Sequence, residues 1–245
     1  MARESNSTRR QFVRVTAVTG SGLLVGAFGP GCANLSGDKG QKSAGKEAEK
    51  PEEEVSPPED LMREHGVLKR VMLVYEELLR RIEARQDFPP DALTDCANVI
   101  RSFVEDYHEK LEENYLFPRF KKANKLTALV DVLLAQHQAG RKVTDVILQN
   151  AAAIAKNDDG RQKVVRAIRQ FNRMYAPHEA REDTELFPAF RSIVSGNEFD
   201  SLGEDFEKKE NELFGEDGFE KMVDRVGGIE KRMGLYDLSQ FTPKV

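Results

Sequence analysis

Two nearly identical segments of thirteen residues constrain this chain more than any other feature. They read HEKLEENYLFPRF from His108 and HEAREDTELFPAF from His178, and both polar and apolar positions coincide when they are aligned. The sequence has four histidines in all, and two of them begin the two copies. In each copy a glutamate follows the histidine by four residues, which places both side chains on one face of a helix. The repeat therefore predicts two equivalent helices, each presenting a histidine and a carboxylate to the same side.

Each of the four histidines falls on the apolar stripe of a different expected helix. The stripes advance by three and four residues, the period of an amphipathic helix. They comprise Leu61, His65, Leu68, Met72, Tyr75, Leu79 and Ile82; Leu93, Ala97, Ile100, Val104, His108, Leu111 and Tyr115; Leu126, Val130, Leu133, His137, Gly140 and Thr144; and Val164, Ile168, Phe171, Tyr175 and His178. Short connections between long helices favour an antiparallel up-down-up-down four-helix bundle, so the predicted fold class is all-α. Pro118 and Pro188 should kink or end the second and fourth helices soon after the histidines.

Composition divides the chain into four predicted segments. Residues 1–33 form a signal peptide, 34–58 a disordered linker, 59–195 the four-helix bundle and 196–245 a short helical C-terminal extension. The linker is disordered in this interpretation because it has almost no apolar residues to bury. The extension carries two weaker helical patterns separated by a turn at residues 215–218, and we expect it to cap the bundle.

The amino terminus resembles a twin-arginine export signal. Arg9 and Arg10 precede a mildly apolar, glycine-rich run that is too short to anchor the chain across a bilayer. This pattern predicts export to the bacterial periplasm or cell envelope. Processing as a lipoprotein would leave Cys32 as a membrane tether, whereas ordinary cleavage would fall after Ala33, and the sequence leaves both alternatives open.

Composition excludes several other classes of protein. The 245 residues suffice for one bundle-sized domain with a tail, and a net charge of −5 argues against nucleic acid as a partner. The two cysteines, Cys32 and Cys96, are too few for a disulfide framework or a thiolate metal site. We expect Cys96 to be a small buried side chain within a helix.

Four inward histidines, one on each helix, together with two inward carboxylates predict a metal site. A carboxylate beside a bundle core is costly unless it is paired or bound to a cation. The separation of His108 from His178 along the chain nearly equals that of His65 from His137, so the first two helices map onto the last two. This symmetry predicts two half-sites that face each other, with the glutamates bridging two metal ions. The predicted ligands are His65, His108, Glu112, His137, His178 and Glu182.

The expected cofactor is a pair of iron ions. Nitrogen and oxygen donors without thiolate favour iron, with manganese or zinc as alternatives. A mononuclear site, or none, is the competing interpretation.

The same residues resemble the hemerythrin-like (HHE) cation-binding domain. The resemblance lies in His65, in His137 and in the two HxxxE pairs that are followed by LFP, and it covers about Asp60 to Ser195. It implies a non-haem di-iron centre in an antiparallel four-helix bundle.

Two departures from the oxygen-carrying hemerythrins bear on function. Those proteins have a second histidine one turn away on the third helix, where this chain has Leu133 and Arg141 as the two candidate positions. They also bridge the irons with an aspartate five residues after the last histidine. Asp183 has that spacing, but internal symmetry favours Glu182. The resulting ligand set is closer to the group that resembles iron-centre repair and nitric-oxide-handling proteins, although their paired-cysteine extra domain is absent from this sequence.

The leading functional hypothesis is an exported di-iron protein that binds or senses dioxygen or nitric oxide, or handles iron. An enzyme that reduces nitric oxide or peroxide is the alternative, and it would need an external electron donor that the sequence does not identify. Tyr107, Tyr115 and Tyr175 lie near the ligands and could donate protons or electrons, although core packing is the expected role. A ferritin-like site is disfavoured because its Glu-x-x-His motif occurs once, at Glu105 and His108. A structural or zinc-binding bundle is the remaining alternative.

Overall fold

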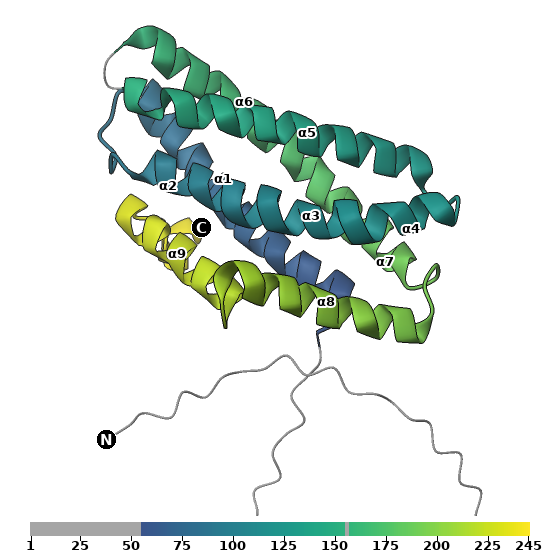
Figure 1. Ribbon diagram of the computed structural model, residues 1–245. Coiled ribbons are helices and arrows are strands. Elements are labelled where there is room, and N and C mark those ends of the chain that lie inside the picture. The colour runs from purple at the N-terminus through teal and green to yellow at the C-terminus, as the bar shows by residue number, and fades with distance from the viewer. Residues whose placement is uncertain (1–54, 155–156) are drawn as a thin grey trace, which may run out of the picture.

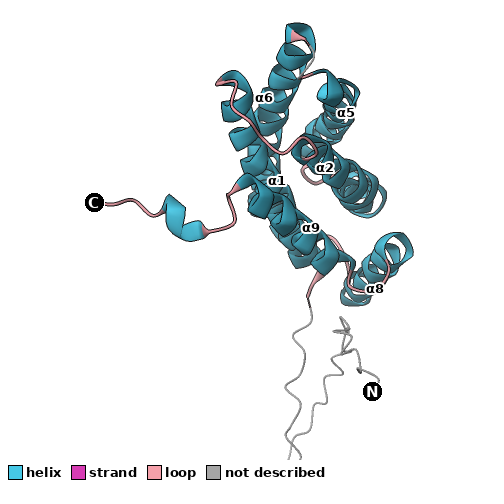
Figure 2. Cartoon of the chain, turned by 90° about the vertical axis from the view of Figure 1, so that its left-hand side faces the viewer, coloured by secondary structure: helices cyan, strands magenta, loops and turns pink. Residues whose placement is uncertain are grey.

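The protein is described by a computed structural model, which covers residues 55–154 and 157–245. Within these ranges the chain forms helices and their connections, and no strand occurs (Figures 1 and 2). This confirms the all-α fold class. The predicted export signal, Cys32 and nearly all of the predicted linker lie outside the described residues.

The helical elements are α1 (Pro57–Glu83), α2 (Ala92–Val99), η1 (Ile100–His108), α3 (Glu109–Leu111), η2 (Glu112–Leu116), α4 (Phe117–Lys122), α5 (Thr127–Asn150), η3 (Ala151–Ala153), α6 (Asp158–Arg181), η4 (Glu182–Leu186), α7 (Phe187–Phe190), α8 (Gly196–Phe214), α9 (Gly218–Met233) and η5 (Leu238–Phe241).

Four long helical stretches surround the main core. They are α1, the run from α2 to α4, α5, and the run from α6 to α7 (Figure 1). α5 lies along α6, α1 packs on both α6 and α2, and η1 contacts both α1 and α5. Among the described helices, none combines the length and hydropathy needed to cross a bilayer.

The two copies of the repeated phrase share an unusual backbone. In each copy a π-helical turn begins at the glutamate, η2 at Glu112 and η4 at Glu182. A proline follows as the second residue of the next α-helical turn. The wider π turn ahead of it accommodates a residue that lacks a backbone N–H and would clash with the preceding turn. The helices end at Lys122 and Phe190, shortly after each proline, as the sequence predicts.

Most of the predicted inward positions are buried, and three are only partly so. Leu79 and Tyr115 keep some exposure, and on α1 the fully buried side chain is the neighbouring Leu78. Leu126 is also partly exposed because it precedes α5 in a left-handed conformation, with φ of 50°. Cys96 is fully buried, which confirms its predicted role as a small core residue.

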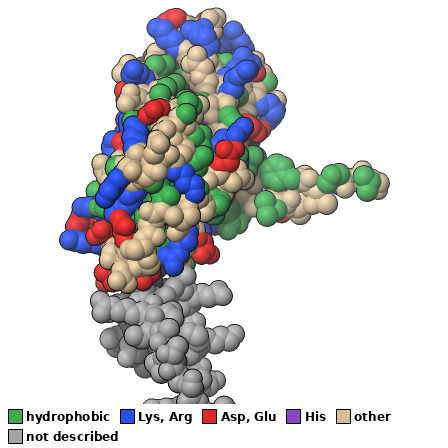
Figure 3. Space-filling view, turned by 90° about the vertical axis from the view of Figure 1, so that its right-hand side faces the viewer, with side chains coloured by type: hydrophobic (Ala, Val, Ile, Leu, Met, Phe, Trp, Pro, Cys, Tyr) green, Lys and Arg blue, Asp and Glu red, His purple; other side chains and the backbone are tan. Residues whose placement is uncertain are grey.

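The C-terminal helices α8 and α9 pack against the amino-terminal half of the chain. α9 contacts α1 and α2, and α8 contacts α1 and η1. Leu202 and Phe206 of α8 and Val226 and Ile229 of α9 are buried in these contacts. Beyond Leu235, which packs against the core, the chain extends away from the helices, and Tyr236, Leu238 and Phe241 are exposed (Figures 2 and 3). Elsewhere the face in Figure 3 mixes acidic and basic side chains, and no histidine of the described residues is visible on it.

Gly140 provides a test of packing next to the histidines. A Cβ added there would lie 2.1 Å from the Tyr175 hydroxyl oxygen. We expect Gly140→Ala to lower the free energy of unfolding by about 1–3 kcal/mol, the usual cost of overpacking a core. Gly228→Ala on α9 is the control, because a Cβ there meets nothing within 4 Å. It should raise stability by about 0.5–1 kcal/mol, as alanine does within a helix. Chemical denaturation measures both, and equal effects would contradict the packing.

Candidate metal centre

The six residues predicted as metal ligands lie together in the core of the bundle. The four histidines are at most 4% exposed, and both glutamates are fully buried. Each histidine comes from a different helical stretch, and each glutamate is the first residue of a π-helical turn. They are His65 on α1, His108 on η1, Glu112 on η2, His137 on α5, His178 on α6 and Glu182 on η4.

The histidines form two pairs whose Nε2 atoms face each other. The Nε2 atoms of His65 and His108 are 3.1 Å apart, and those of His137 and His178 are 3.2 Å apart. Two nitrogens that bind one ion at right angles, each about 2.1 Å from it, would be about 3.0 Å apart. Burial lowers the pKa of His108 well below its ordinary value and that of His137 to about 4. Both rings are therefore neutral at pH 7, the form that binds metal.

Glu182, and not Asp183, reaches the space between the two pairs. Its Oε2 lies 3.3 Å from Nε2 of His65 and 3.2 Å from Nε2 of His178, so it touches one histidine of each pair. Asp183 lies on the other side of the His65 ring, where its Oδ1 accepts a hydrogen bond of 2.8 Å from Nδ1. Its side chain is 36% exposed. The preference for Glu182 on grounds of internal symmetry agrees with this geometry.

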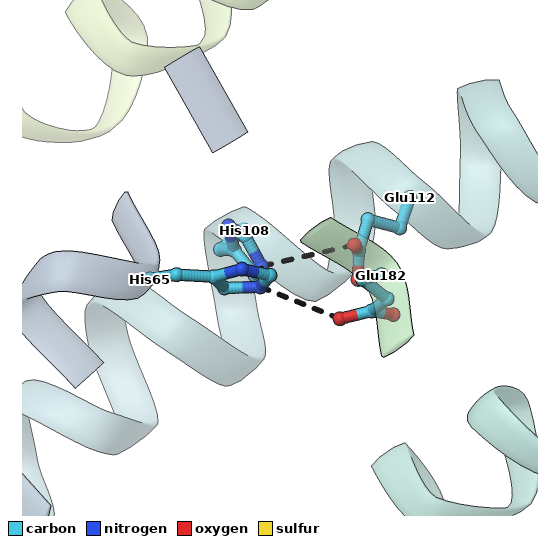
Figure 4. A group of neighbouring side chains, drawn as sticks. All are labelled: His65, His108, Glu112 and Glu182. Atoms are coloured by element: carbon cyan, nitrogen blue, oxygen red, sulfur yellow. Dashed lines mark hydrogen bonds and ion pairs between the residues drawn. The ribbon is translucent and has the colours of Figure 1, made fainter. Parts of the chain in front are cut away.

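Glu112 occupies the equivalent place from the opposite helix. Its Oε2 lies 3.3 Å from Nε2 of His137, and its Oε1 lies 3.8 Å from Nε2 of His108. Figure 4 shows Glu112 and Glu182 pointing toward the ring nitrogens of His65 and His108. None of the four carboxylate oxygens has a well-formed hydrogen bond to a partner among the described residues. Burying an ionised carboxylate costs several kcal/mol without compensation, so this donor set fits a bound cation.

The pKa shifts of the glutamates and of His65 also indicate that the centre needs positive charge. Burial and the negative charge of Glu182 raise the pKa of Glu112 well above its ordinary value. Burial acts in the same sense on Glu182, but the nearby rings of His178 and His65 prevail and lower its pKa. Burial opposes a charge on His65, yet its contacts with Asp183 and Glu182 raise its pKa to about 9. In the metal-free protein, protons therefore supply the positive charge that the two carboxylates need.

Each histidine also uses its Nδ1 atom for a hydrogen bond outside the centre. Ligating histidines characteristically donate this second N–H, which fixes the ring and its tautomer. Three of the four acceptors were not predicted from the sequence, and of these only Glu113 had a signal there, since it aligns with Asp183 in the repeated phrases. Two acceptors directly precede His65 and His137, and two directly follow Glu112 and Glu182. The bonds run from His65 to Asp183 (2.8 Å), from His108 to Glu64 (2.8 Å), from His137 to Glu113 (3.2 Å) and from His178 to Gln136 (2.9 Å).

The phenylalanine of each LFP sequence packs on a histidine. Phe187 stacks on His65 with ring centroids 5.5 Å apart, and Phe117 stacks on His137 at 5.4 Å. The interplanar angles are 23° and 24°. Each repeated phrase therefore supplies one histidine and one glutamate, and also holds a histidine of another helix from two sides. This explains why the apolar positions of the phrase recur with the polar ones.

Leu133 and Arg141, one turn before and after His137 on α5, are the two candidate positions for a further histidine. Leu133 is buried in the core. The Arg141 guanidinium lies 2.6 Å from Glu109 and 2.7 Å from Glu113. Tyr175 donates a 2.6 Å hydrogen bond to Glu109, so an ion-pair network takes the place of a further ligand on this side.

A helical bundle that gathers four histidines and two glutamates in its core belongs to the class of histidine and carboxylate metal-binding bundles. The family described as the hemerythrin HHE cation binding domain matches residues 56–190. The chain therefore belongs to this family, and the buried histidine and glutamate clusters support metal binding.

Similar proteins occur in mycobacteria. The chain is 44% identical over 238 residues to Uncharacterized protein Rv1995 of Mycobacterium tuberculosis (strain ATCC 25618 / H37Rv). The same identity relates it to Uncharacterized protein Mb2018 of Mycobacterium bovis (strain ATCC BAA-935 / AF2122/97). In both cases the match covers 96% of this chain and 91% of the relative. No solved structure gives a significant match.

Removing the metal should destabilise the protein because Glu112 and Glu182 would lose their compensating charge. We expect a strong chelator to lower the free energy of unfolding by about 3 kcal/mol or more, the linkage energy of a ligand present at over a hundred times its Kd. Thermal unfolding with and without chelator measures the effect. The double variant Glu112→Gln, Glu182→Gln should unfold at one temperature in both conditions. A variant that responds to chelation as the wild type does would contradict this account.

Proposed function

We propose that this chain is an exported non-haem di-iron protein, built on an antiparallel up-down-up-down four-helix bundle, that binds or senses dioxygen or nitric oxide, or handles iron. The observation that carries the proposal is the arrangement of two histidine pairs with both glutamates between them. One ion would lie between His65 and His108, and the other between His137 and His178.

The donor set favours iron. It offers nitrogen and oxygen atoms without thiolate, a combination that suits iron, manganese or zinc. Six protein ligands shared by two ions leave coordination positions open. A ferrous pair would supply redox activity and a place for a small ligand at those positions.

Burial restricts the ligand to a small molecule. The histidines are at most 4% exposed, and Phe117 and Phe187 cover two of them. These side chains pack closely around the centre, and a diatomic molecule needs less space to reach it than a bulky organic substrate does. This favours dioxygen or nitric oxide over a large organic substrate.

A second candidate is an oxidoreductase that reduces nitric oxide or peroxide with electrons from an external donor. The observation that favours it is Tyr175, whose ring centroid is 5.4 Å from that of His178 and whose hydroxyl bonds Glu109. A hydroxyl in that place could hold a proton near the centre. Sustained turnover with a reductant would favour this candidate over reversible binding, and a stable zinc complex would favour a structural role.

Export rests on the amino-terminal sequence. Arg9, Arg10 and Cys32 lie outside the described residues, so the periplasmic or cell-envelope location and the lipid tether through Cys32 remain proposals. Labelling of cells with a radioactive fatty acid would test the tether, with Cys32→Ser as the unlabelled control.

Metal content and ligand binding test the proposal directly. Protein purified after iron-supplemented growth should contain about two irons per chain. Reduced without oxygen, it should change its visible spectrum when nitric oxide or dioxygen is added, and for a binding protein removal of the gas should restore the spectrum. A well-folded protein that binds fewer than two irons per chain, even with iron in excess, would overturn the proposal.

Variants at positions 182 and 183 test the bridging role. Glu182→Ala and Glu112→Ala should each lose most of the bound iron because each removes a carboxylate between the pairs. Asp183→Ala should retain most of it at saturating iron, since it removes only a hydrogen bond to His65. The affinity should fall by about 10- to 100-fold, as for other outer partners of ligating histidines. Equal losses of iron at positions 182 and 183 would reverse the assignment.

A further inference from the structure

The residues that hold the four histidines from outside follow the same internal symmetry as the ligands. Asp183 holds His65 and Glu113 holds His137, and these two acceptors occupy the same position in the two repeated phrases. Both are carboxylates that directly follow a glutamate of the centre. At this pair of positions the two half-sites match in chemistry.

The symmetry breaks at the other pair of positions. Glu64 directly precedes His65 and holds His108, whereas Gln136 directly precedes His137 and holds His178. The two hydrogen bonds are nearly equal in length, 2.8 and 2.9 Å, but one acceptor is a carboxylate and the other a neutral amide. A carboxylate acceptor makes the imidazole a stronger donor to a metal and brings a negative charge close to it. His178 has an acceptor of the same shape without that charge.

A second difference between the half-sites lies at the acceptor of His137. Glu113, the acceptor for His137, also forms ion pairs with Arg141 (2.7 Å) and with Lys110 (2.5 Å). These cations partly neutralise the Glu113 carboxylate. They also place positive charge near the Nδ1 side of the His137 ring. Both differences make the hydrogen-bond partners of the His137 and His178 pair less negative than those of the His65 and His108 pair. They therefore act in one direction, against the binding of a cation there.

We propose, on the basis of the di-iron function above, that the two metal positions are inequivalent and that Gln136 and Glu64 set the difference. The position between His65 and His108 binds its ion more tightly. The position between His137 and His178 fills second and releases its ion first. Gln136 and Glu64 are positioning residues, because each acts through the histidine that it holds.

Titration of the metal-free full chain with ferrous iron, under anaerobic conditions and against a competing chelator, tests the proposal. The wild type should show two dissociation constants separated by about tenfold or more, the effect typical of an outer hydrogen-bond partner. Gln136→Glu should tighten the weaker constant, and Glu64→Gln should weaken the tighter one, so that the two constants converge in each variant. Equal constants in the wild type, or unchanged constants in Gln136→Glu, would overturn the proposal.

A control variant separates the hydrogen bond from general charge. Gln138 is exposed on the same helix as Gln136, so Gln138→Glu adds the same charge without contacting His178. It should leave both constants within about twofold of the wild type, because screened surface charges interact weakly. A shift as large as that of Gln136→Glu would overturn the role of the hydrogen bond.

Histidine variants identify which position fills first. His178→Ala should retain one tightly bound iron, and His108→Ala should lose the tight site; circular dichroism verifies that both remain folded. Equal losses would overturn the order of filling. Failure of the di-iron function is distinguishable, because it appears as fewer than two irons in the wild type. Two irons of equal affinity would overturn only the inequivalence.

Discussion

Two carboxylates, Glu112 and Glu182, point toward the same buried space from different helices, and the rest of the centre follows from that arrangement. Neither can be charged there without positive charge close by. Four inward imidazoles provide donors for cations, and in their absence for protons, as the raised pKa of His65 shows. The π-helical turns begin at these same glutamates. A further π-helical stretch, η1, ends at the ligand His108, so this unusual backbone recurs at the centre, as is frequent at functional sites.

The internal duplication supports the centre at three levels. The ligands repeat, the outer hydrogen-bond acceptors repeat at positions next to the ligands, and the phenylalanines that stack on His65 and His137 repeat as well. Each repeated phrase holds a histidine from a different helix, so each half-site depends on both halves of the chain. Such interlocking keeps ring orientation fixed, which a metal centre requires more than a core does.

The sequence was sufficient to predict the helical fold and the residues that meet in the core. Periodicity placed His65, His108, His137 and His178 on buried faces because an inward stripe is a local property of each helix. It could not reveal that Glu64 and Gln136 serve histidines of other helices, because those bonds depend on how the helices are packed against one another. Leu79 was misplaced for a related reason, since the face that is buried at one end of a helix depends on its neighbours. Only Glu113 had a signal in the repeat, because it occupies the same position in its phrase as Asp183 does in the other.

The position of the missing fifth histidine explains why the outer residues matter in this chain. A fifth histidine on one side would make the two ions unequal by ligand count alone. Here Arg141 is directed to Glu109 and Glu113, and each half-site has two histidines with shared glutamates. In the proposed di-iron centre, a difference between the two ions would then arise beyond the ligands. The amide of Gln136 and the cation of Arg141 lie on the same side, so the partners of the histidines there carry less negative charge than Glu64 and Asp183 do on the other side. Similar ligands with different outer partners would give the two proposed positions different affinities, and the replacement of one carboxylate by an amide is a small change that would have this effect.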